Sequence, residues 1–284
     1  MADWIASIET VDARDYEANI GALIDAGYDV IVTVGSAMDA ATRATALKYP
    51  EIYFIGVDQP QAAGGEAIPN LAGVVFPEDQ LGFLSGALAA MMTRSEKIGA
   101  VCVSDAWPPA RLYGEGYRAG AAYANPDVEA TVVYHNEVAL DKSFSDPQWS
   151  AAETNTLIDS GVDVIFAVGE TTGAEALITA TKRGAYVVGA DMDQFFIIPL
   201  AAPKLLTSVL KLVTPAVANL VSEAKQAQNR EGDFLFGDYV GQVGLAPYHD
   251  LDQTIPETVK SRMAELSQAL SQGEVQTGVS ISNP

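Results

Sequence analysis

The sequence predicts an α/β protein of the doubly wound class, arranged in two lobes, and three observations support this. Residues 24–35 (IDAGYDVIVTVG) and 158–169 (IDSGVDVIFAVG) are identical at eight of twelve positions, at a constant offset of 134. Each copy continues through a helical stretch into a second apolar run that ends in Gly-x-Asp, at Asp58 and at Asp191. Strand-like and helix-like segments alternate along the chain, which is the pattern of helices that cover a mostly parallel sheet.

The repeat predicts a ligand site as well as an architecture, because it indicates one βαβ unit in each half. In open α/β sheets, ligands bind outside the carboxyl ends of the strands. Two such halves that face each other would direct the strand ends at a shared cleft. The residues at those ends are Gly35, Asp58, Gly169 and Asp191.

Short apolar runs bounded by turn residues predict the strands. Most are continuous Val- and Ile-rich runs, which is typical of strands buried on both faces of a parallel sheet. The predicted strands are 4–8, 29–35, 52–57, 72–76, 98–103, 130–135, 163–169, 185–190 and 206–210. The string LFGDYVGQVGLAPYHD, which includes residues 236–250, is rich in Gly. Irregular chain is therefore predicted for 236–250.

Apolar residues at a spacing of about 3.6 predict the helices between these strands. The predicted helices are 14–26, 37–48, 78–93, 110–124, 147–160, 172–183, 214–228 and 257–271. Carboxylates that accept backbone N–H groups favour helix starts, and glycines favour helix ends. The expected starting acids are Asp12, Asp79 and Asp146, and the expected stops are Gly27, Gly161 and Gly184.

Composition excludes several classes of function. The chain has 284 residues, 49% of them hydrophobic, so a full core is expected and disorder is not. A net charge of −21 argues against a nucleic-acid partner, because phosphate binding needs clustered Lys and Arg. The single cysteine, Cys102, lies in an apolar run and predicts an inert buried residue. Two histidines are too few for a His-based metal centre, so we expect no metal and no cofactor.

The first residues show no basic start followed by an apolar stretch, so no signal peptide is expected within this chain, and no run is long enough to predict a membrane span.

Three crossings between the lobes are expected, near 104–109, near 191–195 and around 236–250. The predicted N-terminal lobe is therefore 1–104 plus about 192–235, and the C-terminal lobe is about 105–191 plus about 236–284. Such a chain would be hinged between its lobes.

Four strings carry a resemblance to a known family: NLAGVVFPEDQLGFLSGALAAMMT, GAYVVGADMDQ, LTSVLK and VGLAPYHD. They resemble the basic-membrane-protein family, the PnrA-like purine-nucleoside receptors of ABC importers, and the likeness runs in order over essentially the whole chain. The resemblance implies the type I periplasmic-binding-protein fold, in which three crossovers join two α/β lobes. It also implies a purine nucleoside or similar small polar ligand, an ABC permease as partner, and an extracytoplasmic, lipid-anchored protein.

One departure from the family concerns the beginning of the match. Family members open with a strand, a loop with a motif like D-D-x-x-F-N, and a helix, whereas the likeness starts here at about MADWIASIETVDARDYEANI. We expect the first family strand and helix to be missing, which would leave a sheet edge open. That segment supplies an aromatic and polar residues to the family's nucleoside pocket.

Carboxylates are the first group of candidate ligand-binding residues. Asp58 and Asp191 end equivalent strands and could accept hydrogen bonds from ligand hydroxyls, each contributing about 1.5–3 kcal/mol. The resemblance implies that Asp191 corresponds to the family's acid that binds the ribose. Asp193 is a candidate for the same part. The alternative for each is that the carboxylate caps the following turn.

A loop between strand and helix, Gly169-Glu-Thr-Thr-Gly173, is the second candidate group, because exposed amides at a helix start suit an anion or a polar base edge. Glu170 and Thr171 depart from the family's more Gly-rich sequence, and the alternative is a plain tight turn with Thr171 or Thr172 as the cap. Gly35 begins the equivalent loop in the first copy.

Two aromatic residues and one lysine complete the candidate set. Phe144, in SFSDPQW, falls where the family has a base-stacking aromatic, and the alternative is that it packs ahead of the next helix. Trp107 lies in a Pro-flanked connection, where aromatics often meet ligands. Lys211, in LTSVLK, matches a family lysine near the ligand, and the alternative is a solvated charge at a strand end.

The sequence therefore predicts a non-enzymatic receptor whose lobes close on a small polar ligand and present it to a membrane permease. A cytosolic ligand-sensing regulator on the same scaffold is the alternative, and a nucleoside-processing enzyme is a third. The sequence shows no nucleophile–base pair, GxSxG motif or P-loop, so no catalytic residue is expected.

Overall fold

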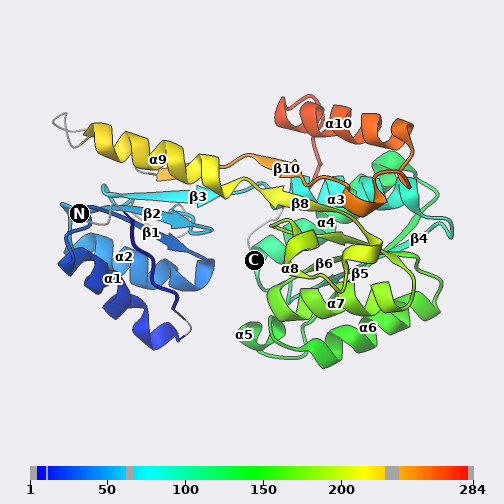
Figure 1. Ribbon diagram of the computed structural model, residues 1–284, viewed down its shortest axis with the longest axis horizontal. Helices are drawn as coiled ribbons and strands as arrows, with labels where there is room; N and C mark the ends of the chain where they lie inside the picture. Colours follow the sequence, from blue (N-terminus) through cyan, green and yellow to red (C-terminus); the bar gives the residue numbers. More distant parts are fainter. Residues whose placement is uncertain (1–4, 11, 62–66, 228–236, 281–284) are drawn as a thin grey trace. The chain divides into compact units, whose positions relative to one another are not determined.

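The protein forms two compact units, which were identified in a computed structural model that describes residues 5–10, 12–61, 67–227 and 237–280. Unit 1 comprises 1–76 with 212–242, and unit 2 comprises 77–211 with 243–284. Each unit is an α/β sandwich with its own sheet and its own core (Figure 1). The chain therefore passes from one unit to the other at three points.

Unit 1 contains a parallel sheet in the order β1-β2-β3-β9. Its strands are β1 (Val30–Val34), β2 (Tyr53–Val57), β3 (Leu71–Val75) and β9 (Gly237–Val240). Its helices are α1 (Tyr16–Asp25), α2 (Asp39–Lys48) and α9 (Val213–Ala227), with the 3-10 turns η1 (Ala13–Asp15) and η2 (Ser36–Met38). In Figure 1, α1 and α2 cover one face of this sheet and α9 lies along the other.

Unit 2 contains a sheet in the order β10-β8-β7-β6-β4-β5, parallel except for β10. Its strands are β4 (Lys97–Cys102), β5 (Glu129–Tyr134), β6 (Val164–Val168), β7 (Tyr186–Gly189), β8 (Leu205–Lys211) and β10 (Val243–Leu245). Its helices are α3 (Glu78–Met92), α4 (Pro108–Ala124), α5 (Leu140–Ser143), α6 (Pro147–Asp159), α7 (Glu170–Lys182), α8 (Gln194–Ile197) and α10 (Glu257–Ser271), with η4 (Ala202–Lys204) and η5 (His249–Leu251).

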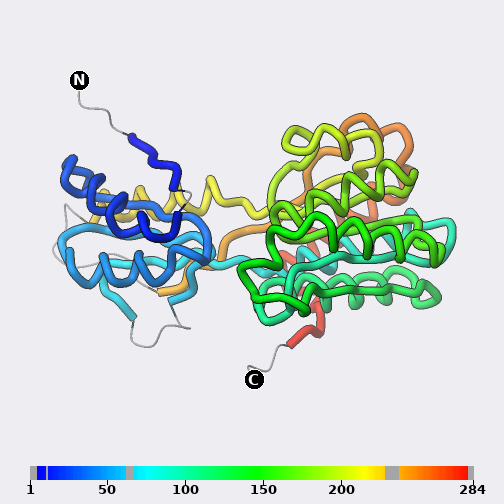
Figure 2. Tube along the Cα trace, turned by 90° about the horizontal axis from the view of Figure 1, so that it is seen from below, coloured from blue at the N-terminus to red at the C-terminus, as the bar shows by residue number. Residues whose placement is uncertain are grey.

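Alternate residues of the central strands are buried in two separate hydrophobic clusters of unit 2, one on each face of the sheet. On β6, Val164, Phe166 and Val168 enter the cluster with α3, α4 and α10, whereas Ile165 and Ala167 enter the cluster with α6 and α7. Because successive side chains point to opposite faces of a sheet, a strand buried on both sides must be apolar throughout. Figure 2 shows α6 and α7 side by side over their face.

Helices α3 and α4 pack closely because four glycines remove side chains from their contact. A Cβ atom on Gly86 would stand 1.9 Å from the carbonyl oxygen of Tyr117, and one on Gly120 would stand 1.9 Å from that of Phe83. Gly82 and Gly116 also face backbone carbonyls of the opposite helix. The close approach places Tyr113 and Tyr117 in the core, with Tyr117 stacked on Phe166 at 5.6 Å.

Apart from the 4–8 run, the expected strands and helices lie within a few residues of observed elements, and the residues predicted to start or stop helices lie near the helix ends. Asp146 caps α6 by accepting the N–H of Trp149 at 3.0 Å, and Asp12 caps η1. Asp79 lies in the first turn of α3. Gly27, Gly161 and Gly184 all have positive φ angles, of 89°, 103° and 86°, as the predicted helix stops require.

Two strand predictions need correction. Trp4 lies outside the described residues, and the rest of the 4–8 run forms no strand, with Ile5 87% exposed. Residues 236–250 are not wholly irregular, because β9 and β10 lie within them. On β1, Ile31 and Thr33 are buried on the face toward α1 and α2, whereas Val32 and Val34, on the opposite face of this edge strand, are exposed.

The boundaries between the units also differ from the predicted ones. The first two crossings follow Phe76 and Lys211, rather than lying near 104–109 and 191–195, whereas the third follows Gln242 and lies within the predicted 236–250. Strand pairing is the reason: β4 pairs with β6 and β8 pairs with β7, which places 97–102 and 205–211 in unit 2. Residues 237–240 join unit 1 because β9 pairs with β3.

Candidate functional site

The carboxyl ends of the parallel strands gather most of the predicted site residues of unit 2 on one edge of its sheet. Trp107 follows β4, Phe144 follows β5, Glu170 follows β6, Asp191 follows β7, and Lys211 ends β8. Since the carboxyl edge of an open α/β sheet is where ligands bind, this edge is the candidate site.

A buried ion pair lies beside the half-buried carboxylate of Asp191. The Nζ of Lys211 lies 2.9 Å from Oε1 of Glu78, with the two side chains only 4% and 8% exposed. The same Nζ lies 3.7 Å from Oδ1 of Asp191, whose side chain is 38% exposed. The ammonium thus balances the buried carboxylate, and Asp191 adds a negative charge that solvent reaches.

Tyr113 contacts the same carboxylate oxygen of Asp191. Its phenol O–H donates to Oδ1 of Asp191 at 2.5 Å, and the ammonium of Lys211 lies 6.0 Å from the centre of its ring. The backbone N–H of Lys211 also donates to the carbonyl oxygen of Asp191, at 3.0 Å. The position of the aspartate is therefore fixed through its main chain and through one carboxylate oxygen.

The two predicted aromatic residues meet. The rings of Trp107 and Phe144 are 5.2 Å apart with their planes at 68°, an edge-to-face pair. Both side chains are half-buried. Trp107 is the residue that precedes α4, and Phe144 ends the short helix α5, so two connections at the carboxyl edge supply the pair.

The Gly169–Gly173 loop is the start of a helix rather than a separate turn. Gly169 is the N-cap of α7 with φ 113°, and a Cβ there would stand 2.0 Å from Cγ1 of Val103. Glu170 and Thr171 form the exposed first turn, whereas Gly173 is buried inside it. Thr172 is buried and donates to the carbonyl oxygen of Ser143 at 2.7 Å.

Asp193 is engaged in structural contacts. Its carboxylate accepts the N–H of Phe195 at 3.2 Å, which caps α8, and lies 2.8 Å from Nε2 of His249. The imidazole of His249 stacks on Phe195 with ring centres 4.1 Å apart. Asp193 thereby joins α8 to η5, next to the segment that carries Asp191.

Gly35 and Asp58 lie together at the carboxyl edge of unit 1. The N–H of Gly35 donates to the carbonyl oxygen of Val57 at 3.0 Å, and the N–H of Asp58 donates to that of Val74 at 2.8 Å. Gln59, which the sequence did not single out, donates from its buried amide to the carbonyl oxygen of Gly35 at 2.9 Å. Unit 1 thus repeats the arrangement of glycine and aspartate.

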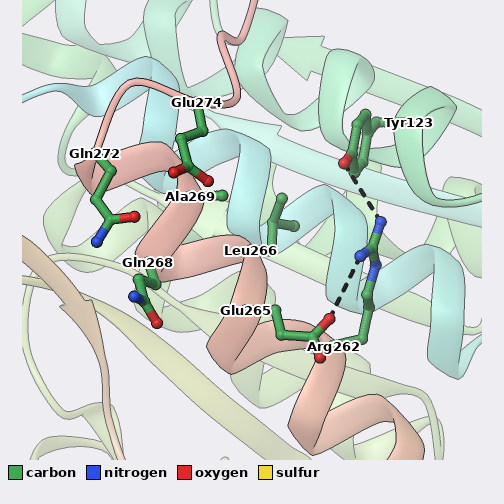
Figure 3. Close-up of a pocket in the computed structure, with 8 residues that line it drawn as sticks. All are labelled: Tyr123, Arg262, Glu265, Leu266, Gln268, Ala269, Gln272 and Glu274. Carbon is green, nitrogen blue, oxygen red and sulfur yellow. Dashed lines mark hydrogen bonds and ion pairs between the residues drawn. The ribbon is translucent and has the colours of Figure 1, made fainter.

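A separate pocket of about 300 Å³ lies on unit 2 between α10 and the end of α4 (Figure 3). Arg262 spans it, since its guanidinium donates to the Tyr123 hydroxyl at 3.3 Å and to Glu265 at 3.5 Å. None of the predicted site residues lines this pocket.

Sequence reasoning missed Glu78, Tyr113 and Gln59. Glu78 follows a proline at the start of an apolar helix, where an acid is common in the first turn, and Tyr113 lies within an apolar helical face.

Within the described residues, no group of three or more His, Cys, Asp or Glu side chains could hold a metal ion. No helix among them is long and apolar enough to cross a membrane.

Comparison with known proteins identifies relatives over nearly the whole chain. The family described as "ABC transporter substrate-binding protein PnrA-like" (Bmp) matches residues 5–277. Basic membrane protein B of Borreliella afzelii is 35% identical over 72% of this chain and 57% of its own length. Basic membrane protein A2 of Borrelia garinii is 27% identical over 92% of this chain and 75% of its own. The chain therefore spans little more than half the length of some curated relatives.

Solved structures share the fold. A solute-binding protein of an ABC transporter system from Conexibacter woesei has a TM-score of 0.71 at 21% identity, covering 93% of this chain and 84% of its own. A transcriptional activator of the comK gene from Bacillus halodurans also has a TM-score of 0.71, at 22% identity over 93% and 86% of the two chains. The periplasmic solute-binding protein of Actinobacillus succinogenes with bound D-allose has a TM-score of 0.61 at 16% identity, covering 88% of each chain. These likenesses confirm the type I periplasmic-binding-protein fold.

Proposed function

Since the chain belongs to the Bmp family of PnrA-like substrate-binding proteins of ABC transporters, we propose that it captures a small polar solute outside the cytoplasm and delivers it to a membrane permease. The solute is a purine nucleoside. The protein binds this ligand without converting it chemically.

The observation that carries the proposal is the arrangement around Asp191. Both side-chain contacts that the described residues make with its carboxylate go to Oδ1, from the Tyr113 hydroxyl and the Lys211 ammonium. Oδ2 of this half-buried side chain is thus the oxygen offered to a ligand. A fixed carboxylate oxygen accepts well from a hydroxyl, and a hydrogen bond to a charged group contributes about 1.5–3 kcal/mol. A ribose supplies such hydroxyls.

The aromatic pair supports a planar partner for the other end of the ligand. Trp107 and Phe144 are half-buried and fix each other edge to face, so a ring face is presented without a large loss of side-chain freedom. Base stacking on an aromatic ring contributes about 1–3 kcal/mol and tolerates different bases. We assign stacking to this pair.

The remaining predicted residues take supporting parts in the proposal. The first-turn amides of Glu170 and Thr171 suit a polar base edge, because helix starts leave backbone N–H groups without helical partners. Gly173 keeps the first turn of α7 compact, and Asp193 braces α8 against η5. On unit 1, Gly35 and Asp58 form the equivalent candidate at the carboxyl ends of β1 and β2.

Native mass spectrometry of the purified protein, followed by calorimetric titration with adenosine, guanosine, inosine and uridine, tests the proposal. We expect a purine nucleoside to co-purify or to bind with a micromolar dissociation constant, more tightly than uridine. A folded protein that binds none of the four would overturn the nucleoside assignment. The same titration with D-allose and D-ribose then shows whether the site takes a free sugar instead.

A further inference from the structure

A buried histidine directly after β5 lies between two carboxylates. The three side chains, His135, Glu137 and Asp146, are called the clasp. The His135 side chain is 2% exposed, its Nδ1 lies 2.9 Å from Oε2 of Glu137, and its Nε2 lies 3.1 Å from Oδ2 of Asp146. The imidazole lies flat on the indole of Trp149, with ring centres 4.0 Å apart and planes at 7°. Neither carboxylate figures in the ligand site described above.

The geometry of the clasp depends on the charge of the ring. A neutral imidazole carries one N–H, whereas the imidazolium carries two. Each ring nitrogen here faces a carboxylate oxygen, so only the imidazolium can donate to both. Among the described residues, the charged groups in contact with the ring are Glu137 from the segment after β5 and Asp146 from the start of α6, while α6 also supplies the uncharged ring of Trp149.

The clasp closes the segment that carries Phe144. Glu137 and Asp146 stand near the two ends of this segment, and one ring holds both. The N–H of Asp146 donates to the hydroxyl of Thr172 at 2.9 Å, and the N–H of Thr172 donates to the carbonyl oxygen of Phe144 at 3.2 Å. A continuous chain of hydrogen bonds thus joins His135 to the residue that contacts Trp107.

We propose that His135 is a positioning residue: its charged ring closes the 137–146 segment and holds Phe144 against Trp107, and loss of the ring proton loosens that segment. The consequence for ligand affinity rests on the proposed function, because it assumes that the Phe144 ring receives a base. The ordering of Phe144 itself does not depend on any ligand.

The hydrogen bonds of the clasp require two ionised carboxylates and a ring with two N–H groups. The hydrogen bond from His135 holds the pKa of Glu137 below its usual range, and the N–H of Trp149, with His135, does the same for Asp146. A carboxylate with a lowered pKa stabilises the fold above its unfolded-state pKa, and this contribution is lost as the pH falls through the folded-state value. An imidazole with a single N–H could donate only one of the two hydrogen bonds. Both are therefore made together only by the imidazolium between two ionised carboxylates.

A ligand-free measurement tests the positioning role. The protein is labelled with 5-fluorotryptophan, and fluorine NMR follows Trp149 and Trp107 between pH 5 and 8.5, with assignment by Trp→Phe variants. We expect both resonances to move with one midpoint, and His135→Gln to abolish both movements. A Trp107 resonance that does not follow the Trp149 titration, or that titrates equally in the His135→Gln protein, would overturn the proposal.

A milder variant keeps the test decisive if His135→Gln does not fold. Glu137 is 66% exposed, so Glu137→Gln removes one charge of the clasp at the surface. We expect it to lower the shared midpoint, because one less carboxylate stabilises the imidazolium. Asp141→Asn changes an exposed carboxylate of the same segment and should leave the midpoint unchanged. An equal midpoint in the wild-type and Glu137→Gln proteins would contradict the clasp.

Calorimetric titration with adenosine at pH 6 and pH 8 tests the consequence for binding. Affinity should fall about fivefold or more at pH 8 in the wild-type and Asp141→Asn proteins, since one hydrogen bond to a charged group is lost. The His135→Gln protein should bind weakly and equally at both pH values. A pH-independent wild-type affinity would contradict the link to the ligand. If adenosine binds at neither pH, the titration is repeated with guanosine, inosine and uridine. The nucleoside assignment fails if none of the four binds, and the fluorine titration still decides the role of His135.

Discussion

Asp58 and Asp191 follow the second strand of each sequence copy and share the same rare backbone conformation, with φ angles of 60° and 67°. Residues other than glycine avoid positive φ, and aspartate tolerates it better than most. The repeat has therefore kept both a carboxylate and a strained main chain at the carboxyl ends of β2 and β7. Strain of this kind accumulates at functional sites, where the surrounding structure holds it.

Substitution of Asp191 should weaken nucleoside binding without unfolding the protein. Asp191→Ala removes the carboxylate that Tyr113 fixes, and we expect a loss of at least tenfold in affinity, about 1.4 kcal/mol. Asp191→Asn keeps a side chain that tolerates positive φ and should lose less. Calorimetric titration measures both. Asp127→Ala, an exposed acid at the opposite end of β5, is the matched control, and unchanged affinity in Asp191→Ala would exclude the hydroxyl contact.

Removal of the Phe144 ring should separate stacking from packing. The ring is half-buried and contacts Trp107, so Phe144→Ala should weaken nucleoside binding by about 1–3 kcal/mol, while the melting temperature stays nearly intact. Calorimetric titration and thermal unfolding measure the two effects. A large fall in melting temperature with unchanged affinity would show that Phe144 serves packing instead.

The buried pair of Lys211 and Glu78 should respond to removal of one partner. Lys211→Met leaves the carboxylate of Glu78 buried without this ammonium, and breaking a buried pair in this way costs about 3–5 kcal/mol. The double variant with Glu78→Gln should recover much of that loss, because no charge remains buried. Urea unfolding of the wild-type protein, Lys211→Met, Glu78→Gln and the double variant measures the coupling. Additive losses would show that the two groups are not coupled.

Cys102 should be unreactive in the folded protein. Burial inside β4 raises the pKa of its thiol to about 12, so the reactive thiolate is scarce at neutral and mildly alkaline pH. We expect no reaction with a disulfide reagent at pH 8 in the native protein and one thiol per chain after denaturation. Rapid reaction of the native protein would mean that β4 opens readily to solvent.

The glycines between α3 and α4 should tolerate no side chain. Gly120→Ala would place a methyl group 1.9 Å from the carbonyl oxygen of Phe83, and overpacking of this kind costs about 1–3 kcal/mol or more. Gly21→Ala is the matched control, because nothing lies within 4 Å of that position on α1. It should stabilise the protein by about 0.5–1 kcal/mol. Denaturant unfolding compares the two, and equal effects would contradict the tight contact.

Features that depend on neighbouring residues can be predicted from this sequence, whereas features that depend on contacts between distant residues cannot. Strand and helix positions depend on local periodicity, and Asp191 and Lys211 lie at strand ends that the apolar runs define. Unit boundaries depend on pairing between distant strands, such as β3 with β9, and the local sequence does not show which strands pair. Tyr113 lies within an apolar helical face, so its hydrogen bond to Asp191 emerges only when α4 packs over the carboxyl edge.

The parallel pairing of β3 with β9 has a consequence for the order in which the chain is made. Residues 71–75 leave the ribosome long before residues 237–240, and all of 77–211 emerges between them. The sheet of unit 1 therefore lacks its last strand at a stage when β4 to β7 of unit 2 already have their neighbours. During that interval the β3 edge is unpaired and can pair with strands of other chains, so this is the stage of synthesis at which aggregation through β3 is expected.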